Sequence, residues 1–180
     1  MDNISIIPVN IPTTNDVVKD IRAILSTARK QVTRMINADM VAAYWLIGKR
    51  IVEEEQHGEA TAKYGERILQ HLSAVLEEEF GNGFSYANLR NMRQFYRTYP
   101  DEQICYTLCI NLPWSHNRLI MRVEDSTARR WYLKEAAEQQ WSVRQLERNI
   151  NSCYYQRMLS SNVNTEEELK REIENTPREM

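Results

Sequence analysis

The chain has 180 residues, of which 42% are hydrophobic and 27% are charged, values that are ordinary for a globular protein with a buried core. Five glycines and five prolines are few, which favours long helices over an all-β sandwich. The net charge of −2 argues against general attraction to nucleic acid, so any such binding requires a local cluster of Lys and Arg.

Three cysteines form no disulfide framework and are typical of a reducing compartment. The first residues lack the basic and apolar regions of a signal peptide, and no run of about 18 apolar residues exists that would span a membrane. We therefore expect a cytoplasmic protein without a membrane partner.

The first long helix is predicted from a helical apolar pattern that begins near Asp16 and ends at Gly58. Residues 1–15, which carry two prolines, are expected to form an irregular arm, with Thr14 or Asn15 capping the helix that follows. The pattern fits one long helix, or two helices that meet at residues 37–39, packed within their own domain. A strict heptad places Asp39 at a core position, which disfavours a coiled-coil dimer.

Six further segments follow in chain order. Helices are predicted over residues 60–80, 85–99, 114–123, 126–139 and 142–159, whereas residues 101–113 fit a buried strand or a short helix equally well. Pro100 ends the third helix, and Ser142 with Gln145 forms a capping box at the start of the last one. We expect a mainly α fold: a helical domain over residues 16–160, built as a multi-helix bundle that includes a helix-turn-helix-like unit. Residues 161–180 are expected to form a polar linker or tail.

The leading candidate site is the helix over residues 85–99, which follows a turn that carries Gly81 and Gly83. Ser85 is expected to cap this helix through its side chain, and Leu89, Met92 and Tyr96 to form its buried face. The opposite face carries side chains that read bases or hold phosphates, although a solvated surface would show the same pattern; they are Arg90, Asn91, Arg93, Gln94 and Arg97.

Two other segments carry candidate nucleic-acid contacts. Two helices joined by a short turn are predicted over residues 126–148, with Arg144 and Arg148 on one stripe of the second helix. This unit could equally be a structural support for the helix over residues 85–99. His116, Arg118 and Arg122 lie at or after a helix start, where phosphate binding competes with simple local capping. Trp131, Tyr132 and Trp141 are expected in the core rather than stacked on bases.

Catalytic chemistry finds no support in the sequence. Common nucleophile, phosphate-loop and metal motifs are absent, so we expect no catalytic residues, no metal site and no cofactor. Pro100-Asp101 and the distant Glu168-Leu169-Lys170 spell the letters of a PD…ExK nuclease motif. That motif needs adjacent strands that bring its acids to a metal, and the second half lies in a polar tail, so we reject it.

Four blocks of this chain resemble, in order, the N-terminal domain of the YhcG-type family of bacterial proteins. They are YWLIGKRIVEEEQHG, AKYGERILQHLSAVLEEEFGNGFSYANLRNMRQFY, LPWSHNRLIMRV and WSVRQLERNINSCYYQRML. The resemblance implies a helical, helix-turn-helix-like DNA-binding module that delivers a C-terminal PD-(D/E)XK nuclease domain to its substrate. It also implies that this chain ends where the nuclease domain would begin, so that the chain by itself is no enzyme.

The sequence therefore predicts a DNA-binding module whose partners are DNA and the family's C-terminal nuclease domain. The alternative is a protein-interaction or dimerisation module in which the long first helix pairs with another subunit, as in a homodimer. Both can hold together, because helix-turn-helix proteins often bind two half-sites as dimers.

Overall fold

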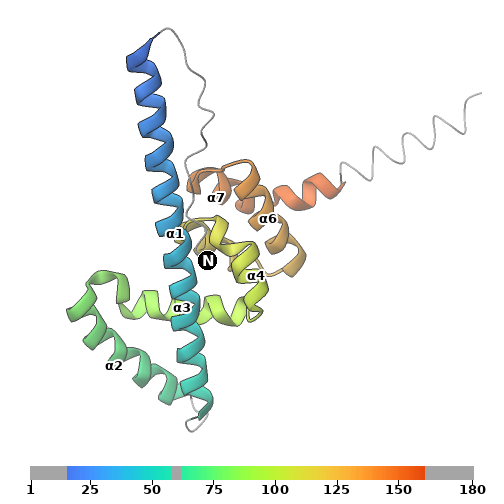
Figure 1. Ribbon diagram of the computed structural model, residues 1–180. Helices are drawn as coiled ribbons and strands as arrows, with labels where there is room; N and C mark the ends of the chain where they lie inside the picture. The colour runs from blue at the N-terminus through green and yellow to red at the C-terminus, as the bar shows by residue number, and fades with distance from the viewer. Residues whose placement is uncertain (1–15, 58–61, 161–180) are drawn as a thin grey trace, which may run out of the picture. The chain divides into compact units, whose positions relative to one another are not determined.

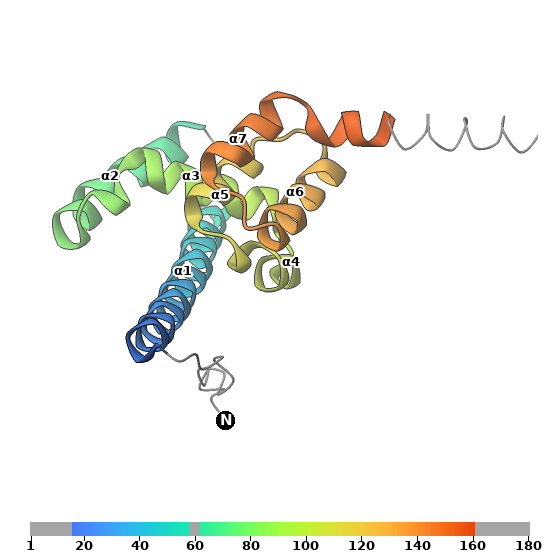
Figure 2. The same cartoon turned by 90° about the horizontal axis from the view of Figure 1, so that it is seen from above.

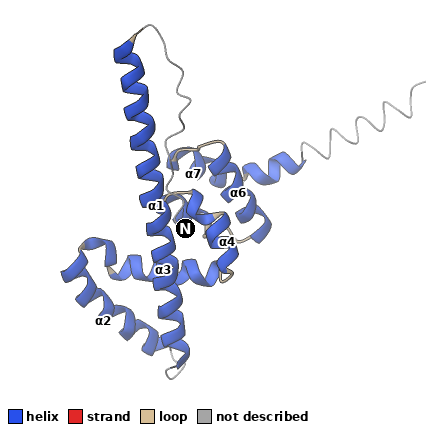
Figure 3. Cartoon of the chain, in the orientation of Figure 1, coloured by secondary structure: helices blue, strands red, loops and turns tan. Residues whose placement is uncertain are grey.

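A computed structural model of the protein describes residues 16–57 and 62–160. Helices and the loops between them make up this part of the chain, as Figure 3 shows, so the predicted mainly α fold is confirmed. None of these helices is both long and apolar enough to cross a membrane. The expected arm at 1–15 and tail at 161–180 lie outside the described residues.

The chain forms two compact units, Met1–Trp114 and Ser115–Met180. The first contains the helices α1 (Val17–His57), α2 (Ala62–Phe80), α3 (Tyr86–Thr98) and α4 (Glu102–Thr107), with the short 3₁₀ helices η1 (Asn82–Phe84) and η2 (Cys109–Asn111). The ambiguous apolar segment after Pro100 is thus helical. Asp101 caps α4 by accepting a hydrogen bond from the Gln103 N–H at 2.8 Å.

The core of the first unit lies where α3 crosses the second half of α1 (Figure 1). Ile51 of α1, Leu69 of α2 and Leu89 and Met92 of α3 are almost fully buried together. Gly48 permits the close crossing, because a Cβ atom there would lie 2.1 Å from the Met92 carbonyl oxygen. Figure 2 shows α2 and α3 gathered at one end of α1.

The first half of α1 does not pack against its own domain, which corrects the expectation that this helix does so. α1 is one helix and not two, but no residue from Val17 to Met40 is buried, and Val41 is the first that is. Its cap is Asp16, whose carboxylate accepts hydrogen bonds from the backbone N–H groups of Val18 and Lys19, rather than Thr14 or Asn15.

The second unit contains α5 (Trp114–Ile120), which begins at the boundary, α6 (Ser126–Glu138) and α7 (Val143–Asn151), and residues 154–160 are helical again. The Asp125 carboxylate caps α6. The predicted capping box of α7 is confirmed, because Ser142 and Gln145 exchange both expected hydrogen bonds. Local sequence signals therefore define where both α6 and α7 begin.

Candidate nucleic-acid interface

The α3 helix buries Leu89 and Met92 as its sequence pattern predicts, together with Phe95, whereas the predicted Tyr96 is half-buried. Leu89, Met92 and Phe95 are fully buried, and Tyr96 packs edge-on against Trp45 of α1 with ring centroids 5.1 Å apart. Ser85 precedes the helix as expected, but its side chain makes no capping hydrogen bond, which corrects its predicted role. Its backbone carbonyl instead accepts the hydrogen bond from the Leu89 N–H.

Two of the three arginines of α3 bind one carboxylate of α1. Arg93 donates to one oxygen of Glu55 at 2.7 Å, and Arg97 donates to the other, also at 2.7 Å. The Glu55 side chain is only 12% exposed and the Arg93 side chain 20%, so this is a half-buried cluster with charge-assisted hydrogen bonds. Gly65 of α2 lies against the same carboxylate. The cluster ties three helices together and neutralises part of the predicted DNA-binding face.

Less of the α3 face than expected therefore remains free for a ligand. Arg90 and Gln94 are exposed, and Asn91 is half-buried. The Gln94 amide donates to the Thr98 hydroxyl at 3.2 Å, which it would have to leave to read a base. Arg90 alone among the arginines of α3 has no ion pair with any described residue.

The residues proposed near the start of α5 separate into interior and surface positions. His116 is 6% exposed, and its Nε2 lies 2.8 Å from the Trp141 carbonyl oxygen, so it links α5 to the turn before α7. Arg118 is half-buried, with its Nε buried and without a hydrogen-bond acceptor among the described residues. Arg122 is exposed. His116 therefore serves the interior of this unit, and Arg122 is the side chain open to a phosphate.

The connection between α6 and α7 is a short, well-defined turn. Gln139 is the C-cap of α6, and the next residue, Gln140, takes the left-handed conformation with φ of 51°. The Trp141 N–H then donates to the Ala136 carbonyl at 3.1 Å, the hydrogen bond that closes a Schellman motif. Ser142 begins α7 one residue later, so the two helices are connected by a turn that is fixed at both ends.

Hydrogen bonds from α6 also hold the far end of α7. The Tyr132 hydroxyl donates to the Asn149 carbonyl at 3.2 Å and accepts from the Tyr155 N–H at 3.3 Å. Tyr132 is buried, as expected, while Trp131 and Trp141 are half-buried and lie in an aromatic cluster with Tyr154. The start and the end of α7 are thus both fixed to the rest of the unit.

Two arginines of α7 are exposed to solvent. Leu146 is fully buried, whereas Arg144 and Arg148, one helical turn apart, are both exposed. Neither forms an ion pair with any residue between 115 and 160. That range contains eight basic residues (Lys and Arg) and five acidic residues (Asp and Glu). The described residues of the first unit include twelve basic and twelve acidic residues. The net positive charge of the described residues, an excess of three Lys and Arg over Asp and Glu, thus lies in the second unit.

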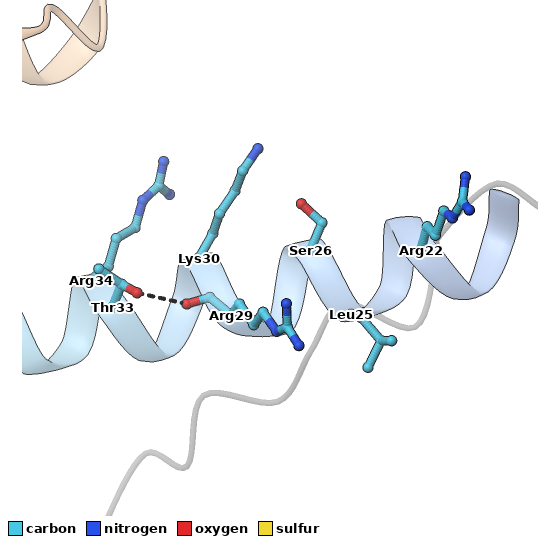
Figure 4. Close-up of a pocket in the computed structure, with 7 residues that line it drawn as sticks. All are labelled: Arg22, Leu25, Ser26, Arg29, Lys30, Thr33 and Arg34. Carbon is cyan, nitrogen blue, oxygen red and sulfur yellow. Dashed lines mark hydrogen bonds between the residues drawn. The ribbon is translucent and has the colours of Figure 1, made fainter. Parts of the chain in front are cut away.

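A second basic surface lies on the first half of α1 and was not among the predicted contacts. Figure 4 shows the side chains along this part of the helix, where four cations are interspersed with two hydroxyl side chains. We call the four cations the basic row; they are Arg22, Arg29, Lys30 and Arg34. All four are exposed, and none pairs with a carboxylate in the described parts of the chain. Their helical spacing was the signal that could have revealed them.

The described residues contain no group of three or more His, Cys, Asp or Glu side chains placed to hold a metal ion. Burial, and secondarily the Glu102 carboxylate, raises the pKa of the Cys105 thiol to about 12. Burial also raises the pKa of Cys109. These two cysteines are therefore protonated, unreactive parts of the core.

These observations define a mainly helical protein in which α7 carries two exposed arginines that no described carboxylate binds. The chain belongs to the family of DUF1016 N-terminal domains, whose family model matches residues 20–157. It is similar to the protein named "Putative nuclease YhcG" of Escherichia coli (strain K12), with 36% identity over 167 residues. That match covers 77% of this chain and 44% of the relative, so the chain spans less than half of the relative's length. No solved structure matches the chain.

Proposed function

We propose that this domain binds duplex DNA through α6, its turn and α7, a helix-turn-helix-like unit with α7 as the helix that enters the major groove. The observation that carries the proposal is the pair of exposed, unpaired arginines on a helix fixed at both ends. Arginine side chains near the start of such a helix read guanine or hold phosphates. The domain would deliver a nuclease domain of the same family to its substrate, in keeping with the name of its relative.

We choose α7 over α3 as the recognition helix because two arginines of α3 are bound by a carboxylate, whereas those of α7 are bound by no described carboxylate. Arg93 and Arg97 of α3 would have to leave Glu55 to contact DNA, which would leave a nearly buried carboxylate without its partners. Arg144 and Arg148 pay no such cost, because no described carboxylate holds them. Arg122, in the same unit as α7, is the further exposed cation that we assign to a phosphate.

The test compares two double variants in mobility-shift titrations of duplex DNA at two salt concentrations. We expect Arg144→Ala with Arg148→Ala to weaken binding roughly tenfold or more and to reduce its salt dependence. The matched control is Arg90→Ala with Gln94→Ala, which removes the exposed polar side chains of α3 and should change binding little.

Both double variants should melt at the temperature of the parent chain, because all four side chains are exposed. Loss of binding in the α3 variant alone would move the recognition helix to α3. Unchanged binding in both variants would contradict a role for either helix, and absence of binding by the parent chain at low salt would contradict the proposal as a whole.

A further inference from the structure

The first half of α1 carries an apolar stripe that is not covered by any described residue. Six positions, separated by alternating steps of three and four residues, define what we call the seam: Val18, Ile21, Leu25, Ala28, Val32 and Met35. The five larger side chains of the seam are between 50% and 58% exposed, and Ile24 and Ile36 beside it are 42% and 57% exposed. A contiguous apolar surface of this kind marks an interaction site on a globular protein.

The seam is distinct from the surface by which α1 joins its own core. The buried row Val41, Trp45 and Gly48, continued toward the start of the helix at the same spacing, reaches the exposed Arg34 of the basic row. The seam, continued in the other direction, reaches Asp39, then the half-buried Ala42, and then Leu46, which is 49% exposed. The body of the first unit and the seam therefore lie on opposite sides of α1, so a partner on the seam would not collide with that body.

We propose that the seam binds the same seam of a second copy of this chain, as a short parallel two-helix coiled coil. Alternating steps of three and four residues form the pattern by which two helices interlock over several turns. From Val18 to Met35 the seam spans about 27 Å of helix, or five turns. Because the pattern is regular and belongs to one helix, an identical helix is complementary to it.

The flanking charges select the parallel arrangement. Arg22 and Arg29 lie on the same flank of the seam, seven residues apart. An antiparallel pair would gather these arginines of both copies on one side, whereas a parallel pair places them on opposite sides. In the parallel pair each arginine lies beside the apolar Val17 or Ile24 of the other copy, which its aliphatic stem can cover.

Asp39 sets the end of the paired region. It occupies the next position of the seam, where two parallel copies would bring their carboxylates together, and the helix enters its own core two residues later. Like charges at facing core positions oppose pairing. Asp39 therefore disfavours a coiled coil along the whole helix and confines pairing to the part of α1 before it.

Sedimentation equilibrium of the whole chain without DNA tests the proposal. We expect a concentration-dependent dimer that becomes monomeric in Leu25→Glu with Val32→Glu and tightens in Asp39→Leu. The matched control is Val75→Glu, an equally exposed valine on α2 at 48%, which should leave the dimer unchanged. A monomer at every concentration, or a dimer that survives the two glutamates, would overturn the proposal.

Disulfide trapping tests the orientation in a Cys153→Ser background, which removes the exposed native thiol. In a parallel pair Val18→Cys and Met35→Cys should each oxidise to a dimer separately, whereas in an antiparallel pair over the same residues Val18 faces Met35. Crosslinking only when the two variants are mixed would show an antiparallel pair and would refute the parallel arrangement. Because the two experiments use no DNA, their outcome is independent of the proposed nucleic-acid binding.

Discussion

Glu55 is the residue on which the arrangement of the first three helices depends. Its carboxylate accepts hydrogen bonds from Arg93 and Arg97 of α3 and packs against Gly65 of α2. Both oxygens are used, and the side chain is largely shielded from water. A carboxylate in such a position stabilises the fold mainly because its removal leaves a half-buried cation without a partner.

We expect Glu55→Gln to destabilise the chain by about 2 kcal/mol, because one amide oxygen cannot replace two charged acceptors. The midpoint of thermal unfolding measures the effect. Glu54→Gln is the matched control, since its ion pair with Arg50 is exposed and should contribute less than about 1 kcal/mol. Equal losses in the two variants would contradict the structural role of Glu55.

The three cysteines should differ sharply in reactivity. Cys153 is exposed, whereas Cys105 and Cys109 are buried, with the pKa of Cys105 raised to about 12. At pH 8 the Cys105 thiol is therefore protonated, and the thiolate is the reactive form. We expect one thiol per folded chain to react with a disulfide reagent, three after denaturation, and none in folded Cys153→Ser. Fast reaction of a second thiol in the folded chain would contradict the buried placement.

At the scale of the helices, the crossing of α1 and α3 depends on Gly48. A methyl group there would meet the Met92 carbonyl oxygen at 2.1 Å and the Tyr96 Cβ at 3.1 Å. The obstacle is mainly backbone, so the two helices would have to move apart. Gly48→Ala should therefore destabilise the chain by about 1–3 kcal/mol, despite the roughly 1 kcal/mol by which alanine favours a helix.

Gly83→Ala provides the comparison, because nothing lies within 4 Å of its added methyl group. We expect its unfolding midpoint to differ little from that of the parent chain. If Gly48→Ala melted at or above the parent temperature, α1 and α3 would not cross as closely as the structure shows.

For the molecule as a whole, we expect binding without cleavage. Asp101, half of the apparent nuclease motif, caps α4 through its carboxylate and does not lie on a strand. The second half lies outside the described residues, and the chain spans 44% of its nuclease-named relative. Supercoiled plasmid incubated with this chain and Mg²⁺ or Mn²⁺ should stay intact, and a metal-dependent nuclease of known activity serves as the positive control. Metal-dependent nicking that persists in repurified chain would contradict this expectation.

Helix positions were largely predictable because they depend on local interactions. The apolar pattern, Pro100 and the capping box of Ser142 and Gln145 each act over a few residues and need no knowledge of distant contacts. The local pattern was less informative for the segment after Pro100 and for the start of α1. Residues 101–113 were too short for periodicity to decide, and Asp16 was overlooked as the cap of α1.

The candidate site could be predicted only in part, because exposure of a charged side chain is a tertiary property. Arg93 and Arg144 look alike in the sequence, and each lies on a polar face of an amphipathic helix. Arg93 is bound by a glutamate 38 residues earlier in the chain, and Arg144 by no described carboxylate. The apolar half of α1 was likewise assigned to the core, since periodicity shows that a helix has an apolar face and not what covers it.

The helices, most of their ends and the family to which the chain belongs can be inferred from the amino-acid sequence, since they follow from neighbouring residues and from similarity along the chain. Which arginines are neutralised and which apolar face is left open became known only from the folded structure. Those properties depend on contacts between segments far apart in the sequence. Folding brought Glu55 to α3 and left the first half of α1 uncovered by any described residue.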